Sequence, residues 1–350
     1  MIARLGIAWL RRVRQLCAPM WRTSLRWILA LVIGLTEAGV AVAQSSRTDI
    51  REINGRLQVD LLAWGQRQGF KYQWNPRTGD LLLTQRSTRL AFKTDTARME
   101  LNGVLVWMEW PVTKDRERPY LSAHDLNAIL NPLLKPTKRP VGKKVRRVAL
   151  SAGHGGKDPG NMEGTRQEKT YTLKLAREGE KRLKAAGFEV IQVRDRDEFV
   201  PLEERPVRAN RRQADIYVAL HFNGSPSGSG TAQGAETFAL TLNNGRSTNG
   251  GRSSGPQRGN RQDRDNLLLA YHIHRMILKS LGLSDRGVKH ANFVELRDAQ
   301  MPAVLVEGGF MDNRQDALKI FSDQERGQLA DAIVDGIQAY RRLVERGAAE

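Results

Sequence analysis

Short apolar runs alternate with longer amphipathic stretches over the C-terminal two thirds of the chain. Runs of four to seven residues bounded by turn residues are typical of strands, and longer stretches with helical spacing are typical of helices. The predicted strands are Val145–Leu150, Glu189–Val193, Ile216–Leu220, Glu236–Leu242, Phe293–Leu296 and Ala303–Val306, and the predicted helices are Gln167–Ala186, Leu202–Arg212, Asp265–Leu281, Arg314–Phe321 and Asp323–Arg346. This order predicts an α/β domain over residues 145–346, with a mainly parallel twisted sheet and helices on both faces.

The pattern is different over residues 49–134, where short strands follow one another. Turn residues at 75–79 and Asn102-Gly103 separate predicted strands at Lys71–Trp74, Asp80–Thr84, Arg89–Lys93, Met99–Leu101 and Val104–Trp107. Helices are expected at Val59–Gln68 and at Ser122–Leu133, where Ser122 is the N-cap and His124 is a surface residue. The order predicts a small α+β module.

Two further segments have little apolar content. Residues 135–147 carry seven Lys/Arg and two Pro, which predicts a basic linker that is either simply solvated or contacts the cell wall. Residues 243–265 consist mainly of Gly, Ser, Asn and Arg, which predicts a flexible insertion beside the functional site. Its five arginines would either hold an anionic substrate or serve only solubility.

The first 43 residues have the features of a signal peptide. A basic region precedes the apolar run Trp27–Leu35, and Ala41-Val42-Ala43 forms a small-residue cleavage site. Nine apolar residues are too few to span a bilayer, so we expect export to the periplasm or cell envelope, or secretion, without a stable membrane anchor. Met20 is an alternative start, and Arg11-Arg12 leaves the twin-arginine export route open.

Charge and cysteine content narrow the function further. The chain has a net charge of +18, and removal of six Arg and Glu37 with the signal segment leaves +13. Such a charge favours polyanions, of which the cell wall is expected for an exported protein. No aromatic residues are interleaved with the basic ones, so nucleic acid is not the expected partner. The single cysteine, Cys17, lies in the signal segment, so any zinc must be held by His and Asp/Glu.

Candidate catalytic residues stand where predicted strands end. Three apolar runs lead into His154, His221 and Glu307, and Glu168 begins a helix fourteen residues after His154. The carboxyl ends of parallel strands face one crevice, so these side chains should converge. Two imidazoles and a carboxylate form a hydrolytic zinc set with an open fourth position, and Glu307 is left as a base.

The same residues lie in motifs that resemble the zinc-dependent N-acetylmuramoyl-L-alanine amidases (amidase type 3) of bacterial cell walls. About 200 residues carry the resemblance, in the runs Gly153–Gly160, Glu168-Lys169, Val193–Asp195, Val200–Arg205, Ala209-Asn210, Ala214-Asp215, His221–Asn223, Gly234–Thr237, Arg286–Lys289 and Met301–Phe310. The resemblance implies one Zn²⁺ per catalytic domain, bound by His154, Glu168 and His221, with Glu307 as the catalytic carboxylate. It also implies cleavage of the amide between N-acetylmuramic acid and L-alanine in peptidoglycan.

Other positions in these motifs are weaker candidates. Asn223 is expected to hydrogen-bond the substrate and Arg297 to bind a peptide carboxylate; each could instead be structural. His272, His274 and His290 end no core strand and are expected not to be ligands. The chain departs from the family at Ser151-Ala152, where Asp-Pro is usual, at Phe222, where a small residue is usual, and at Gly308, where a larger one is common. No departure removes a ligand.

The N-terminal module resembles, more loosely, the N-terminal-like domain of copper amine oxidases that recurs in exported bacterial wall proteins, through its paired strands, the Asn102-Gly103 hairpin and Pro119–Ser122. This implies a binding or spacing role and no copper site. For the whole protein, two alternatives to a peptidoglycan amidase are a wall-binding or regulatory protein without turnover and a zinc hydrolase for another amide. The sequence leaves open whether an activator protein is needed.

Overall fold

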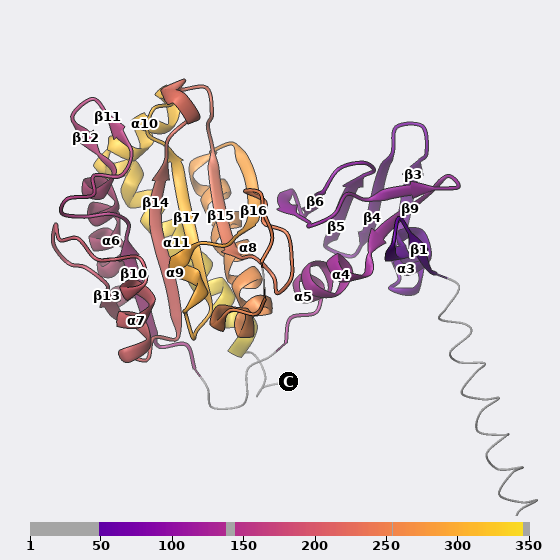
Figure 1. The fold of residues 1–350 in the computed structure, drawn as a ribbon, viewed down its shortest axis with the longest axis horizontal. Coiled ribbons are helices and arrows are strands. Elements are labelled where there is room, and N and C mark those ends of the chain that lie inside the picture. The colour runs from indigo at the N-terminus through magenta and orange to yellow at the C-terminus, as the bar shows by residue number, and fades with distance from the viewer. Residues whose placement is uncertain (1–48, 138–143, 254, 346–350) are drawn as a thin grey trace, which may run out of the picture.

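The computed structural model describes residues 49–137, 144–253 and 255–345. The predicted signal peptide, residues 138–143 of the predicted linker and Arg346 lie outside these ranges. Within them the chain forms an N-terminal module and a larger C-terminal part (Figure 1). None of the helices described is both long and apolar enough for a membrane crossing.

The N-terminal module contains two groups of strands and a few short helices. In chain order they are β1 (Ile50–Ile53), β2 (Arg56–Asp60), α3 (Leu61–Arg67), β3 (Lys71–Asn75), β4 (Asp80–Gln85), β5 (Thr88–Lys93), β6 (Arg98–Leu101), β7 (Val104–Trp107), β8 (Thr113–Asp115), β9 (Arg118–Ser122), α4 (Ala123–Asp125), the π-helical turn η2 (Leu126–Leu130) and α5 (Asn131–Leu134). Strands β3 to β7 form an antiparallel meander, whereas β1, β2, β9 and β8 form a separate sheet.

Capping and pairing explain where the module differs from the sequence prediction. The expected helix Val59–Gln68 begins only at Leu61, because Asp60 accepts hydrogen bonds from the backbone N–H groups of Leu62 and Ala63 while Val59 pairs in β2 with Leu121. Strands β1, β2, β8 and β9 were missed. Ser122 caps the next helix as expected, through a hydrogen bond from the N–H of Asp125. His124 is exposed, and its Nε2 lies 3.3 Å from Glu109 Oε2.

The C-terminal part confirms the predicted α/β class. Its elements are β10 (Arg147–Ala152), the short hairpin β11 (Met162–Glu163) and β12 (Arg166–Gln167), α6 (Glu168–Ala185), β13 (Glu189–Gln192), α7 (Glu204–Arg211), β14 (Ile216–Asn223), the 3₁₀ turn η3 (Pro226–Gly228), β15 (Ala235–Leu240), the 3₁₀ turn η4 (Arg258–Gln262), α8 (Asp263–Leu281), β16 (Asp285–Ala291), α9 (Val294–Arg297), β17 (Ala303–Phe310), α10 (Arg314–Phe321) and α11 (Asp323–Glu345). The strand order is β13-β10-β14-β17-β15-β16. Every neighbouring pair is parallel except β17 with β15.

The two faces of this sheet support two separate cores, because successive strand side chains point to opposite faces. On one face, Val148, Val218 and Val304 join a large core with α6, α8 and α11. On the other, Ala149, Tyr217 and Leu305 form a smaller core with α7 and α9. Helices therefore cover both faces, as predicted. The alternation also places Ser151, His221 and Glu307 on the face of the smaller core.

The predicted strand Phe293–Leu296 is wrong. Those residues lead into the short helix α9, and the strand beside β15 is β16, formed by the preceding residues Asp285–Ala291. A four-residue apolar run fits either a strand or a buried helical turn, so its pattern alone could not decide.

The module docks on the edge of the C-terminal sheet. Val106 of β7 pairs in parallel with Val288 of β16, which joins both parts into a sheet of eleven strands. The Trp107 indole donates from Nε1 to the carbonyl of Arg286 at 2.9 Å, and the Leu105 N–H donates to Asp285 Oδ2 at 2.8 Å. Gly287 leaves room for the indole, since a Cβ there would lie 2.8 Å from Trp107 Cδ1.

The described residues of the insertion (243–253 and 255–265) make regular contacts within it and with the module. Its described residues contain η4, an antiparallel bridge between Arg246 and Arg252, and backbone hydrogen bonds such as Ser253 N to Gly245 O at 2.9 Å. The Arg246 guanidinium lies 4.7 Å from the Trp110 ring of the module, and the Arg56 guanidinium lies 3.7 Å from the same ring. The insertion therefore packs against the module.

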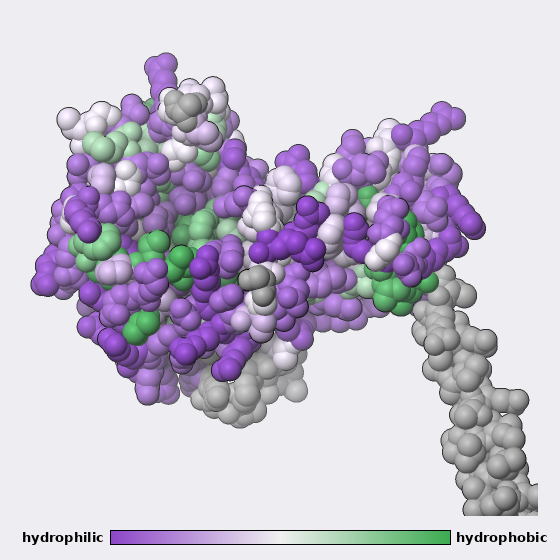
Figure 2. Space-filling view, viewed as in Figure 1, coloured by the Kyte–Doolittle hydropathy of each residue, from purple (hydrophilic) through white to green (hydrophobic). Residues whose placement is uncertain are grey.

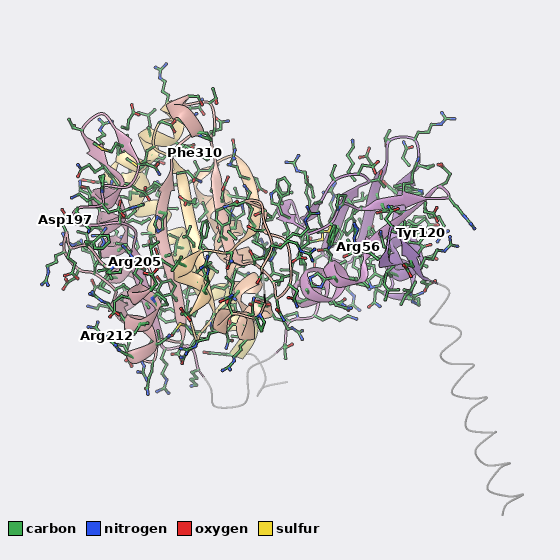
Figure 3. The ribbon with its side chains drawn as sticks, in the orientation of Figure 1. Arg56, Tyr120, Asp197, Arg205, Arg212 and Phe310 are labelled. Atoms are coloured by element: carbon green, nitrogen blue, oxygen red, sulfur yellow. The ribbon has the colours of Figure 1, made fainter. Side chains whose placement is uncertain are left out.

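Arg56 and Tyr120 mark the module in Figure 3, and hydrophilic residues cover most of the face seen in Figure 2.

Candidate metal centre

His154 lies in a tight turn directly after β10. It and the next two residues all have left-handed backbone angles, with φ of 57° at His154, 128° at Gly155 and 57° at Gly156. This conformation costs little for glycine but is uncommon for histidine. A Cβ at Gly155 would lie 2.1 Å from the carbonyl oxygen of Glu198, so the turn packs too tightly for any other residue there.

Two buried arginines, Arg194 and Arg205, fix the backbone of this turn through hydrogen bonds (Arg205 is labelled in Figure 3). Arg194 donates to the carbonyls of Ala152 at 2.9 Å and Gly153 at 2.6 Å. Arg205 donates to the carbonyls of Ala152 at 2.7 Å and His154 at 2.8 Å. The backbone that carries His154 is therefore fixed by charged donors, which compensates for its unusual conformation.

Glu168 is the first residue of α6, and its carboxylate is almost completely buried. Oε2 accepts from the N–H of Asn161 at 2.9 Å and from Asn161 Nδ2 at 3.0 Å, and Oε1 accepts from the N–H of Phe222 at 3.1 Å. Burial alone would raise the pKa of Glu168, but hydrogen bonds and charge from His154 and His221 outweigh it and hold that pKa well below its usual range. The carboxylate is therefore ionised.

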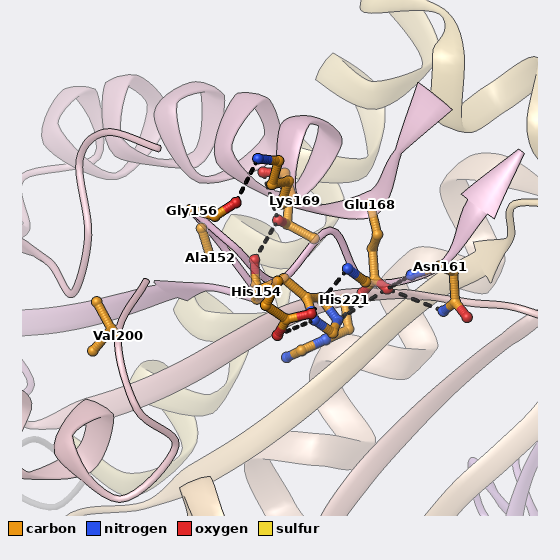
Figure 4. Close-up of polar contacts among 12 residues, drawn as sticks. Ala152, His154, Gly156, Asn161, Glu168, Lys169, Val200 and His221 are labelled. Carbon is orange, nitrogen blue, oxygen red and sulfur yellow. Dashed lines mark hydrogen bonds and ion pairs between the residues drawn. The ribbon is translucent and has the colours of Figure 1, made fainter. Parts of the chain in front are cut away.

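His221 reaches the same carboxylate from β14. Its Nδ1 lies 3.0 Å from Glu168 Oε1, and His154 Nε2 lies 3.0 Å from Glu168 Oε2 (Figure 4). Burial opposes charge on His221, yet Glu168 and Glu295 together raise its pKa to about 10. A proton on His221 thus offsets the negative charge of these carboxylates, a role that a bound cation could take instead.

The structure brings the three predicted ligands together. One ligand atom from each of His154, Glu168 and His221 lies within 4.8 Å of the others, the only such group among the described residues. The donor set is two imidazole nitrogens and a carboxylate, which suits Zn²⁺. The ring nitrogens that face away are also paired with acids: His154 Nδ1 lies 2.8 Å from Asp158 Oδ2, and His221 Nε2 lies 3.4 Å from Glu295 Oε1. Carboxylates in this position typically orient metal-binding histidines.

Glu307 lies beside this group on β17, in register with His221 of the neighbouring strand. Its Oε2 atom is buried and has no hydrogen-bond partner among the residues described. Burial raises the pKa of Glu307 to about 8; His221 opposes the rise, and Glu168, Glu236 and Glu295 add to it. An unpartnered carboxyl with a pKa near neutrality can take up and release a proton.

The two weaker candidates, Asn223 and Arg297, are not among the residues that line the cavity beside this group. Asn223 ends β14, and its Nδ2 is buried without a partner, which leaves a donor free for a ligand. Arg297 ends α9 and donates from Nε and Nη2 to the carbonyl of Asn292 at 3.1 and 2.8 Å. Its guanidinium is occupied by its own loop, which favours the structural interpretation of Arg297.

A cavity of about 280 Å³ opens onto these groups. Its lining combines acidic, imidazole and amide groups with apolar side chains; the lining residues are His154, Asn161, Glu168, Leu202, His221, Phe293, Val294, Glu295, Leu305 and Glu307. No residue of the insertion is among them. A volume of about 280 Å³ is large enough to admit part of a substrate beside Glu307.

Sequence reasoning missed three residues of the site: Asp158, Asn161 and Glu295. Asp158 follows His154 by four residues in the same glycine-rich run, and this short spacing was the only sequence feature that could have indicated their contact. Asn161 has no comparable signal. Glu295 is an acidic residue in the apolar run Phe293–Leu296, where a charge needs a buried partner.

Residues 148–339 match the sequence profile of the family described as N-acetylmuramoyl-L-alanine amidase. The chain is 34% identical over 195 residues to the uncharacterized protein YqiI of Bacillus subtilis, covering 56% of this chain and 84% of that protein. It is 34% identical over 225 residues to the N-acetylmuramoyl-L-alanine amidase AmiC of Neisseria meningitidis, covering 57% of this chain and only about half (54%) of that one.

Among solved structures, the chain is similar to the catalytic domain of CwlV, an N-acetylmuramoyl-L-alanine amidase from Bacillus (Paenibacillus) polymyxa var. colistinus. The identity is 30%, the TM-score is 0.48, and the match covers 57% of this chain and 99% of that one. The profile match extends over more than half of the chain and includes all four predicted site residues. The chain belongs to the N-acetylmuramoyl-L-alanine amidase family.

Proposed function

We propose that this protein is a zinc-dependent amidase that hydrolyses the bond between N-acetylmuramic acid and L-alanine in peptidoglycan. One observation carries the proposal: His154, Glu168 and His221 converge on one point, and the unpartnered carboxyl of Glu307 lies beside them in the same cavity. Family membership supports the choice of substrate.

His154, through Nε2, Glu168, and His221, through Nδ1, would hold one zinc ion. Zinc bound there would supply a Lewis acid that polarises the amide carbonyl and lowers the pKa of a water molecule. Three protein ligands leave one position open, as catalytic sites need. Asp158 would keep the His154 ring turned toward the ion.

Glu307 would carry the proton. Its Oε2 takes a proton from the attacking water and returns it to the nitrogen of the departing L-alanine, so that the carboxylate is restored after each cycle. The buried environment that raises its pKa makes both forms accessible near neutral pH. Asn223 would donate a hydrogen bond to the substrate; the support for this role is that its Nδ2 is buried without a partner among the described residues.

We also infer a setting for this reaction. The apolar run and small-residue site in residues 1–43 favour export to the periplasm or cell envelope, and the charge that remains favours contact with an anionic wall. The N-terminal module would serve as a wall-binding or spacing unit, as its resemblance to the copper amine oxidase N-terminal-like domain implies. Sedimentation of the protein with purified wall, with and without 0.5 M salt, tests this part.

Digestion of purified peptidoglycan tests the reaction. The zinc-loaded protein, the protein treated with EDTA, and a Glu307→Gln variant are compared by mass spectrometry of the soluble products. Free stem peptides that begin at L-alanine, produced only by the zinc-loaded protein, are expected. Fragments cut within the stem would instead indicate a different amide hydrolase. Wall binding without any release, by protein that holds zinc, would favour a binding protein or an enzyme that needs an activator.

A further inference from the structure

Glu295 is a buried charge that the proposed reaction does not itself use. It lies in the first turn of α9, on the smaller-core face of the sheet, and is 2% exposed. Burying a carboxylate is costly unless it is paired and hydrogen-bonded. The groups that contact the Glu295 carboxylate offset the cost of burying it, and they indicate which side chains it holds in place.

The two oxygens of Glu295 have different partners. Oε2 accepts hydrogen bonds from the Tyr217 hydroxyl at 2.5 Å and from Ser151 Oγ at 3.1 Å. Oε1 faces His221 Nε2 at 3.4 Å. Strands β10 and β14 thus fix one oxygen through hydroxyl groups, which leaves the other directed at a predicted metal ligand.

Pairing with Arg205 does not explain this arrangement. The Arg205 Nε lies 3.9 Å from Glu295 Oε1, farther than the histidine. Arg205 donates instead to the carbonyls of Val200, Ala152 and His154. Its hydrogen-bonding capacity is used by the turn that carries His154, so the close partner of Oε1 is His221.

His221 in turn depends on this carboxylate. Its Nδ1 faces Glu168, and its Nε2 is buried without a hydrogen bond of good geometry among the residues described. A neutral imidazole that binds a metal through Nδ1 must carry its proton on Nε2. The carboxylate oxygen that faces Nε2 is Glu295 Oε1, at 3.4 Å.

We propose that Glu295 is a positioning residue that accepts the Nε2 proton of His221, fixes its tautomer and turns Nδ1 toward the metal. This inference rests on the proposed function, because it requires zinc at His154, Glu168 and His221. The Ser151 hydroxyl on β10 donates to the carboxylate of Glu295 at 3.1 Å. The acid that orients His221 would therefore come from α9 and be held by a strand residue.

The test uses the full chain and follows zinc affinity and the His221 tautomer. A Glu295→Leu variant removes the acceptor, and a Ser151→Asp/Glu295→Leu double variant places a carboxylate on β10 about where the original lay. Asp125→Asn, which alters an equally buried carboxylate in the N-terminal module, controls for general destabilisation. Zinc dissociation constants come from competition with a chromophoric chelator, and tautomers come from ¹⁵N shifts of selectively labelled histidine.

Glu295→Leu should weaken zinc binding by roughly 10–100-fold, the usual effect of removing a residue that orients a metal ligand. The double variant should recover most of that loss, and Asp125→Asn should bind zinc as the unaltered protein does. In the unaltered, zinc-loaded protein, His221 should carry its proton on Nε2.

A proton on Nδ1 of His221 in that state would overturn the inference even if the variants fail to fold. So would a Glu295→Leu variant with unchanged zinc affinity. Either result, with zinc still bound by the unaltered protein, would leave the proposed function intact. Failure of the unaltered protein to bind zinc would overturn both.

Discussion

Gly153 is the position at which one added methyl group should disturb the metal site most selectively. It joins β10 to His154, is buried, and donates its N–H to the carbonyl of Leu220 at 3.0 Å. Its φ is not in the left-handed region, so alanine introduces no backbone strain there. A Cβ at this position would lie 2.3, 2.5 and 2.7 Å from Cε1, Nδ1 and Nε2 of His221. A Gly153→Ala substitution therefore acts on the imidazole ring.

The size of the effect follows from these distances. Carbon atoms pack favourably at about 3.5–4.0 Å, so the ring must retreat by more than ~1 Å. It is held by Glu168 at 3.0 Å and by Glu295 at 3.4 Å, which resist that movement. Overpacking of this kind costs about 1–3 kcal/mol, and each 1.4 kcal/mol corresponds to tenfold in binding. We expect zinc affinity to fall by roughly 10–100-fold and hydrolysis to fall at least as much.

The assay compares zinc dissociation constants and peptidoglycan hydrolysis for Gly153→Ala and Gly179→Ala. The second variant adds the same methyl group inside α6, where its nearest contact is the flexible end of Leu150 at 3.2 Å and alanine gains up to about 1 kcal/mol in helix propensity. That control should retain zinc affinity and activity. Unchanged zinc affinity in Gly153→Ala would refute the packing of Gly153 against a metal-binding His221.

Four other outcomes are expected. Glu307→Gln should lower the rate of hydrolysis about 10²–10⁴-fold while zinc content, measured by atomic absorption, stays the same; loss of zinc would mean that Glu307 is a ligand. EDTA should abolish hydrolysis and added Zn²⁺ should restore it, whereas activity that survives full metal removal would exclude a metal mechanism. Burial lowers the pKa of His290 from 6.5 to about 4, so the full free energy of unfolding is available above pH 6.5 and falls, by at most about 3 kcal/mol, as the pH drops toward 4. Urea unfolding should show a smaller decrease of this free energy over the same pH range in His290→Phe, and an equal decrease would contradict this. Trp107→Ala should free the module from β16 and speed proteolysis within residues 135–147, and an unchanged cleavage rate would show that the indole does not hold the two parts together.

Strand ends were the part of the site that could be predicted well. The alternation of side chains along β10, β14 and β17 follows from the sequence, and parallel pairing then brings residues 154, 221 and 307 to one edge. Glu168 could be added because the helix start that carries it follows the same turn. These inferences need only the period of the pattern and the handedness of the connections.

What failed depended on contacts between distant segments. The composition of the insertion gave no sign that Arg246 would pack on Trp110, more than a hundred residues earlier, or that Asn260 Nδ2 would donate to the carbonyl of Thr241. β16 contains Gly287, Lys289 and His290, so it does not resemble a strand; pairing with β15 on one side and β7 on the other makes it one. The partner of Glu295 was equally hidden, because Tyr217 and Ser151 reach it from strands that only the fold brings together.

The central claim is that three separate segments hold one zinc ion beside Glu307. The most direct measurement is a crystal structure of the zinc-loaded protein with anomalous diffraction recorded on both sides of the zinc absorption edge. The account predicts one strong peak, about 2.0–2.2 Å from His154 Nε2, a Glu168 oxygen and His221 Nδ1. A peak bound through other atoms, or no peak in crystals of protein that hydrolyses peptidoglycan, would contradict it.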